Sequence, residues 1–208
     1  MSYIVAIAGG SGSGKSLLCT ALQKTFGDQA VVFPYDAYNK DQSRFTPEER
    51  DAINYDVPDA YDQDLFLKDL LTLKAGQDVQ IPVFDYASHT RTKETRLVRS
   101  APLILAEGFL VLAIPHEKDY FDLAVYVDAD GDVRLARRIL RDEKERGYPA
   151  EQVVHQYLSS VKPMHEKYIE PCKKKADFVF VNNGLDGLDD AQYAKLVALI
   201  RQGLKQAQ

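Results

Sequence analysis

The segment Gly9–Ser16, GGSGSGKS in one-letter code, constrains this chain more than any other feature of its sequence. It matches the pattern G-x-x-x-x-G-K-[ST], whose glycines let backbone N–H groups turn inward around phosphate oxygens. The apolar run Tyr3–Ala8 precedes it and predicts a strand, and helical spacing follows from Lys15 to Phe26 and ends at Gly27. A phosphate-binding loop between a strand and a helix predicts an α/β fold.

The rest of the chain alternates apolar runs with helical patterns, which is typical of a parallel sheet covered by helices. Further strands are predicted at 31–33, 103–106, 123–127 and 178–181, and helices at 62–74, 130–145, 150–169 and from 189 onward. We expect residues 1–208 to form one domain with the three-layer fold of P-loop NTPases and a mostly parallel sheet. A small β insertion is predicted at about 80–99 and a helical lid at about 130–169.

The charge and the cysteine content of the chain limit which kinds of molecule it is expected to bind. The net charge of -5 argues against nucleic acid, because phosphate backbones attract clustered positive charge. Cys19 and Cys172 are too few for a disulfide framework or a zinc site, which favours a reducing cytoplasm. Neither a signal peptide nor a membrane span is predicted, since the most apolar later window, 101–114, is short and contains Pro102 and Glu107. We therefore expect a cytoplasmic protein that binds small molecules.

Each part of the loop has an expected task. Lys15 would reach the β- and γ-phosphates of a nucleotide, and the Ser16 hydroxyl would ligate Mg²⁺. A flexible turn is the alternative, but the flanking strand and helix favour phosphate binding. A GTPase is not indicated, because Asn39-Lys40-Asp41-Gln42 misplaces the acid of the guanine-reading motif. The backbone predicted to surround the phosphates comprises Gly9, Gly10, Ser11, Gly12, Ser13 and Gly14.

Two acids follow predicted strands at the edge where open α/β sheets bind ligands. Asp36 lies just past the strand at 31–33 and suits a general base or a metal ligand. Glu107 ends the strand at 103–106 and reaches the same edge. A solvated loop is the alternative for each acid taken alone. A phosphate loop together with both acids favours a kinase for small molecules.

Arginines at helical spacing supply the third requirement of such an enzyme. Arg134, Arg138 and Arg141 share one face of the predicted helix at 130–145, with Arg137 beside them. Guanidinium groups fit phosphate oxygens well, so the helix could close over the transferred group. A solvated, salt-bridged face is the alternative, because Asp142, Glu143 and Glu145 are near.

Two segments mix carboxylates with aromatic side chains. Residues 55–62, YDVPDAYD, could hold a sugar by its hydroxyls and stack a base, or could form a capped turn. Residues 84–91, FDYASHTR, have the same character, and His89 in this polar context is a candidate contact for a base.

The chain resembles the uridine kinase (uridine-cytidine kinase) family, within the group that includes phosphoribulokinase and pantothenate kinase. The likeness runs from Ile4 to about Asp177. Its matching pieces are 9–16, 36–38, 55–60, 81–86 with His89 and Arg91, 107–108, 127–130 with 134–142, 145–147, 156–157, 161–164 and 176–177. The resemblance implies transfer of the ATP γ-phosphoryl group to the 5′-hydroxyl of uridine or cytidine.

The resemblance also implies roles for individual residues. Asp36 falls on the catalytic base, near Mg²⁺, while Ser16 and Glu107 fall on the metal positions. Asp56 matches the residue that holds the ribose hydroxyls. The residues that match positions around the nucleoside are Tyr55, Phe84, Tyr86 and His89, and two further nucleoside contacts match Arg138 and Gln156. The lid arginines that approach the phosphates match Arg141 and Arg146. The family further implies a homotetramer. ATP is the expected donor, and GTP stays open as an alternative donor.

Three positions depart from the family pattern. Phe84 stands where a tyrosine is usual, Val57 replaces a histidine, and Tyr148 replaces the second arginine of R-G-R. Losing a polar partner in such a pocket costs about 1–3 kcal/mol, so another hydroxylated acceptor, such as a sugar phosphate or a pantothenate-like compound, stays open. A catalytically idle nucleotide-binding protein is the third alternative.

Overall fold

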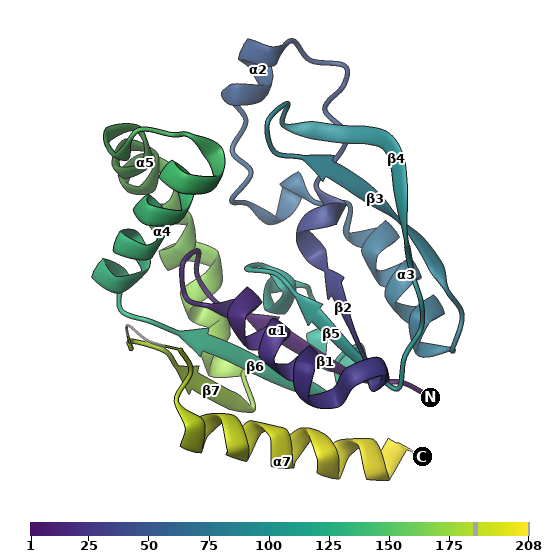
Figure 1. The fold of residues 1–208 in the computed structure, drawn as a ribbon. Helices are drawn as coiled ribbons and strands as arrows, with labels where there is room; N and C mark the ends of the chain where they lie inside the picture. The colour runs from purple at the N-terminus through teal and green to yellow at the C-terminus, as the bar shows by residue number, and fades with distance from the viewer. Residues whose placement is uncertain (185–186, 208) are drawn as a thin grey trace.

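Five parallel strands form the central sheet in the order β2-β5-β1-β6-β7 (Figure 1). The strands span Tyr3–Ala8 (β1), Ala30–Pro34 (β2), Leu103–Glu107 (β5), Leu123–Asp128 (β6) and Phe178–Val181 (β7). The structure is a computed structural model and describes residues 1–184 and 187–207. The predicted parallel sheet is confirmed, and each strand extends the predicted one by no more than a residue at either end.

Helices cover both faces of this sheet and make three layers. On one face, α1 (Lys15–Phe26) and α7 (Asp190–Ala207) bury leucine, valine and isoleucine side chains against alternate strand residues such as Val5 and Ile7. On the other face, α3 (Gln63–Lys74) packs its apolar side chains against Ile4, Ala6 and their neighbours. The alternation of Ile4 to Ala8 between two cores explains why this strand is apolar throughout.

Local signals set the ends of these helices. Helix α1 begins after Gly14 and stops at Gly27, both in positive-φ conformations that favour glycine. Asp62 caps α3, because its carboxylate accepts a hydrogen bond of 3.3 Å from the Leu65 N–H. Thr46 and Glu49 form a capping box on the short helix α2 (Pro47–Asp51), which precedes the aromatic segment 55–62.

The predicted β insertion is an antiparallel hairpin of β3 (Val79–Asp85) and β4 (Thr90–Val98). It stands beside the carboxyl edge of the main sheet, above β2 and α3 (Figure 1). The hairpin does not pair with the main sheet, so its turn at 86–89 is supported by side-chain contacts instead.

Helices on the opposite side of the same edge fill the segment predicted as a lid. Helix α4 (Gly131–Arg146) ends at Gly147, and α5 (Ala150–Gln156) follows. The prediction of one regular helix over 150–169 is wrong in its interior: π-helical turns at Tyr157–Val161 and His165–Ile169 flank a short α6 (Lys162–Met164). Pro163 has no N–H to donate, and wider turns around it accommodate the interrupted ladder.

None of the helices in residues 1–184 and 187–207 combines the length and apolar character needed to cross a bilayer.

Candidate active site

The strand register brings three predicted site segments to one edge of the sheet. Glu107, at the end of β5, is paired with Ile7 of β1 on one side and with Pro34 of β2 on the other. The phosphate loop therefore begins one strand away from Glu107, and Asp36 lies two residues past Pro34 on the other flank. Because the strands are parallel, these side chains share the carboxyl edge that the sequence predicts.

The loop backbone packs so closely against neighbouring segments that a Cβ would not fit at two of its glycines. Gly12 has φ +78°, and a Cβ there would lie 2.4 Å from the Arg134 carbonyl oxygen. Gly14 has φ +98°, and its Cβ would lie 2.2 Å from the Asn182 side-chain nitrogen. Positive φ and close backbone approach together explain the glycines of the motif, and they leave a cradle of the kind that phosphate groups occupy.

Polar side chains of the loop point toward their predicted partners. The Lys15 ammonium donates to the Gly10 carbonyl at 3.2 Å and is buried within the loop. The Ser16 hydroxyl donates to the Glu107 carboxylate at 3.5 Å, which pairs two of the three predicted metal ligands. Oxygen ligands of this type suit Mg²⁺. No cluster of three His, Cys, Asp or Glu side chains among the described residues offers an alternative metal cage.

Asp36 lies where several charges converge. Burial, with the nearby Glu107 carboxylate, raises the pKa of Asp36 to about 7, whereas Lys15 and Arg146 act in the opposite direction. One of its carboxylate oxygens, Oδ1, is buried without a hydrogen-bond partner. A carboxylate in this setting is a candidate general base, because its pKa is close to neutral and an oxygen is available.

The arginine helix is not the solvated face that stood as the alternative. Arg134 and Arg138 are each only 7% exposed. Arg138 donates to the Ser11 hydroxyl at 3.0 Å and to the Gln156 side chain at 2.7 Å, so it joins the phosphate loop to the lid. Arg137 also faces inward and donates to carbonyl oxygens of Gly12, Asn182 and Gly184.

Aromatic side chains form a wall on the hairpin side. The ring centroid of Tyr55 lies 5.4 Å from that of His89 and 6.0 Å from that of Phe84, and Phe84 lies 5.3 Å from Tyr86. His89 has φ +50°, an unfavourable conformation for a residue with a Cβ, which the surrounding structure must maintain. Val57, one of the three departures, packs against the hydrophobic core instead.

The lid reaches the same pocket from the other side. Ser160, on the first π-helical turn, donates to the Asp56 carboxylate at 3.1 Å. Burial raises the pKa of Asp56, and the Ser160 hydrogen bond lowers it. The Arg146 guanidinium lies 5.2 Å from the Tyr86 ring centroid, so a lid arginine contacts the aromatic wall. The predicted nucleoside and phosphate residues thus line one cleft.

Two arginines that support this wall have no predicted role. Arg50 donates to the carbonyl oxygens of Gln42, Phe45, Ser43 and Ser88, and thereby ties the loop before α2 to the hairpin turn. Arg91 donates to the carbonyls of Tyr38 and Asn39. The sequence analysis missed this role because no periodic pattern identifies an arginine that binds carbonyl oxygens. For Arg91, the match to the family was the one available signal.

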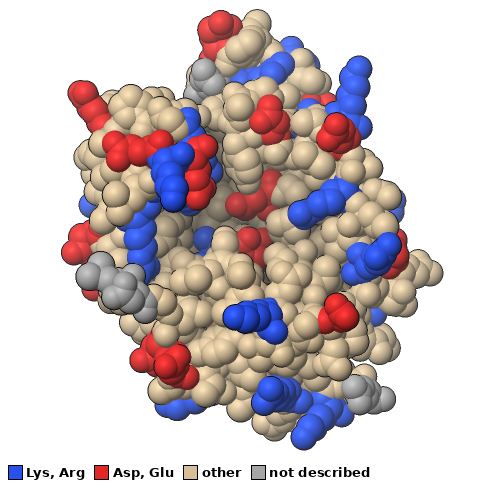
Figure 2. All heavy atoms as spheres, in the orientation of Figure 1, with Lys and Arg blue, Asp and Glu red and all other residues tan. Residues whose placement is uncertain are grey.

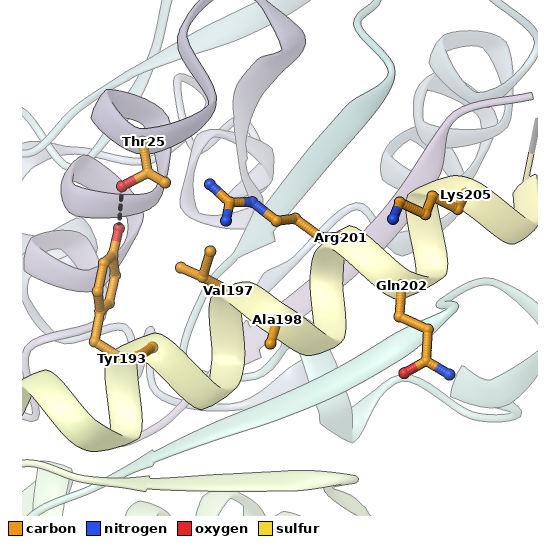
Figure 3. A pocket seen from close by; sticks show the side chains of 8 residues that line it. Thr25, Tyr193, Val197, Ala198, Arg201, Gln202 and Lys205 are labelled. Atoms are coloured by element: carbon orange, nitrogen blue, oxygen red, sulfur yellow. Dashed lines mark hydrogen bonds between the residues drawn. The ribbon is translucent and has the colours of Figure 1, made fainter.

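The cleft is visible on the surface. Figure 2 shows a central hollow with acidic side chains in its depth and basic side chains along one rim. A second hollow, of about 540 Å³, lies along α7 (Figure 3). There the Thr25 and Tyr193 hydroxyls are 2.6 Å apart, and Arg201 and Lys205 point along the groove, but no predicted site residue lines it.

Comparisons with known proteins agree with this geometry. Residues 4–185 match the sequence model of the "Phosphoribulokinase / Uridine kinase family". A uridine kinase of Staphylococcus epidermidis is 45% identical over 182 residues, which are 87% of this chain and 88% of that protein. A uridine kinase of Clostridium novyi is 42% identical over the same shares.

Solved structures share the fold at lower identity. The phosphoribulokinase from Rhodobacter spheroides superposes with a TM-score of 0.65 at 17% identity, over 86% of this chain and 70% of that chain. A possible uridine kinase from Bacillus stearothermophilus gives 0.59 at 21% identity, over 86% and 88%. These likenesses establish a P-loop kinase fold with a parallel sheet. With the match over 4–185, the chain belongs to the phosphoribulokinase/uridine kinase family.

Proposed function

We propose that this protein transfers the γ-phosphoryl group of ATP to the 5′-hydroxyl of uridine or cytidine and so forms UMP or CMP in pyrimidine salvage. The observation that carries the proposal is one cleft in which a phosphate loop and a carboxylate of raised pKa face an aromatic and hydroxyl-binding wall. Relatives at 42–45% identity over 87% of the chain are named uridine kinases, which supports the same acceptor class.

Asp36 is proposed as the base that accepts the proton of the acceptor hydroxyl. A pKa of about 7 leaves a large share of Asp36 ionised at neutral pH and able to hold a proton afterwards. The hydroxyl oxygen then attacks the terminal phosphorus, and the bond to the bridging oxygen of ADP breaks. In such a transfer the protein mainly aligns the two oxygens and compensates charge.

Cationic groups on both sides are proposed to compensate that charge. Lys15 lies within the loop, and Arg138 contacts the loop through Ser11. Arg141 and Arg146 approach from the lid with partly exposed guanidinium groups. Ser16, Glu107 and Asp36 would hold Mg²⁺, which would neutralise part of the charge on the phosphate groups.

The acceptor would lie against the aromatic wall. Asp56 is proposed to hold the ribose hydroxyls, with Ser160 fixing its carboxylate. Tyr55, Phe84 and Tyr86 would enclose the base, and His89 would face its polar edge. Gln156 joins this side through Arg138.

Release of ADP across a panel of acceptors tests the proposal. Uridine, cytidine, purine nucleosides, ribulose 5-phosphate and pantothenate are compared with Mg-ATP and then with Mg-GTP. We expect turnover with uridine or cytidine well above the others. Turnover with only a sugar phosphate or pantothenate would show that the acceptor is not a pyrimidine nucleoside. Substitution of Phe84, Val57 and Tyr148, the three departures from the family pattern, would then test what changed the acceptor. Nucleotide binding with no acceptor-dependent ADP release would indicate an idle binding protein.

We also propose a cytoplasmic homo-oligomer, a homotetramer, that binds neither nucleic acid nor membrane. Support comes from the family resemblance and from the net charge of -5. Light scattering at micromolar concentration gives the mass: four times 23.4 kDa is expected, and a monomer mass would contradict it.

A further inference from the structure

Asp142, near the end of α4, is fully buried and contacts three arginines. Its Oδ1 lies 2.9 Å from Arg141 Nη2 and 3.6 Å from Arg146 Nη1, and its Oδ2 lies 3.4 Å from Arg138 Nε. Arg141 Nε also donates to Oδ1 at 2.9 Å. The side chain of Asp142 is 0% exposed, so it is held in place by the protein on all sides.

The helix does not need this side chain to end. The Gly147 and Tyr148 N–H groups both donate to the backbone carbonyl of Asp142, which any residue would provide. The carboxylate is therefore available to the guanidinium groups. A buried charge is costly unless it is paired, so its presence here indicates that the arginines have a use for it.

The three arginines span the cleft. Arg138 reaches the phosphate loop through Ser11, and Arg146 reaches the aromatic wall at Tyr86. Arg141 and Arg146 keep about a third of their side chains exposed, at 35% and 33%. Three guanidinium charges around one carboxylate leave an excess of two positive charges, and the exposed N–H groups can present that excess to an anion.

We propose that Asp142 is a positioning residue for phosphoryl transfer: its buried carboxylate fixes Arg138, Arg141 and Arg146 in one arrangement around the phosphate site. Free arginines sample many rotamers, whereas donors that are already oriented lose nothing when charge develops in the transition state. Asp142 itself is out of reach of any ligand. The inference rests on the proposed kinase function and deepens it.

Asp142→Asn tests this role, because it removes the charge and keeps the shape. We expect turnover to fall about 10- to 100-fold while the KM values for ATP and for the nucleoside change less than about threefold. Glu143→Gln, at the exposed neighbouring position on the same helix, is the matched control and should retain wild-type turnover. Asp142→Asn with turnover within threefold of wild type overturns the proposal.

A double variant separates positioning from general damage. If Asp142 acts in part through Arg141, then Asp142→Asn combined with Arg141→Ala should be slowed by less than the product of the two single losses. Losses that multiply would show that the two act independently and would overturn the proposal.

An NMR measurement tests the same idea without any acceptor. In the wild type, the Nε–H signal of Arg141, which donates to Asp142, should be sharp and slow to exchange with solvent, and in Asp142→Asn it should broaden. An unchanged signal overturns the proposal even if no acceptor has been found. If Asp142→Asn does not fold, Asp142→Glu keeps the charge on a longer side chain and should fold with reduced turnover. Failure of both to fold would assign Asp142 to stability alone.

Discussion

The two walls of the cleft are built differently. The phosphate wall is backbone at the edge of a buried parallel sheet, where Glu107 is locked in register between Ile7 and Pro34. The acceptor wall is a set of side chains on a hairpin and loops outside that sheet, tied down by Arg50 and Arg91. A change in the phosphate wall would disturb the fold, whereas the acceptor wall can change by single substitutions. This difference explains why all three departures from the family pattern fall outside the sheet edge.

The largest effect should come from the sheet edge. Asp36→Asn removes the proposed base, so turnover should fall about 10²- to 10⁴-fold with every acceptor, while ATP still binds. Single-turnover kinetics and equilibrium binding of ATP measure the two separately. Asp59→Asn, at an exposed acid of the same region, should be silent. Retained turnover in Asp36→Asn would remove the base assignment.

The next effect should come from the glycines of the phosphate loop, which have no side chain to clash with neighbouring segments. Gly12→Ala places a Cβ against the Arg134 carbonyl, and we expect a loss of about 3 kcal/mol in stability and of more than about tenfold in ATP affinity. Gly27 also has positive φ, but its Cβ would meet open space, so Gly27→Ala should lose less stability than Gly12→Ala and no affinity. Thermal unfolding and ATP titration compare the pair, and equal losses would contradict the steric explanation.

The acceptor wall should respond in affinity more than in rate. Arg50→Ala frees the hairpin turn from the loop before α2, and we expect the KM for the acceptor to rise about tenfold with turnover within about threefold. Arg44→Ala, at an exposed arginine of the same loop, is the control. Steady-state kinetics at saturating ATP give both constants. A fall in turnover at unchanged KM would show that the two walls are not separable in this way.

The smallest effect concerns stability and pH. The pKa of Asp36 is raised to about 7 from 3.8, so between these values the folded protein holds a proton that the unfolded chain releases. Stability is therefore lost as pH rises from about 4 to about 7, and Asp36→Asn should escape that loss. At pH 8 without Mg²⁺ we expect the variant to be more stable than wild type, and near pH 4 the two should be equally stable. Urea unfolding at both pH values measures the difference.

Sequence patterns predict the buried strands and helices of this molecule well, but they predict poorly the side chains that hold its loops and arginines in place. The strands, the ends of α1 and the Asp62 cap follow from apolar periodicity and from residues with one strong conformational preference. Arg50 and Asp142 could not be assigned, because their partners lie far along the chain or inside a run of charges that resembles a solvated face. Asp36 and His89 were candidates from their place in the sequence, whereas the role of Asp56 came from resemblance, and the structure adds the neighbourhood of all three.

The two π-helical turns around Pro163 have a consequence for engineering. An α-helix turns by about 100° per residue, so deleting one residue within Tyr157–Val161 would rewind that turn and rotate Ser160 away from Asp56. Gln156, on the other side of the turn, would stay where Arg138 holds it. Loss of one codon could therefore detach the sugar-facing contact and leave the phosphate-facing contact in place, a route to new acceptors that substitutions within a regular helix do not offer.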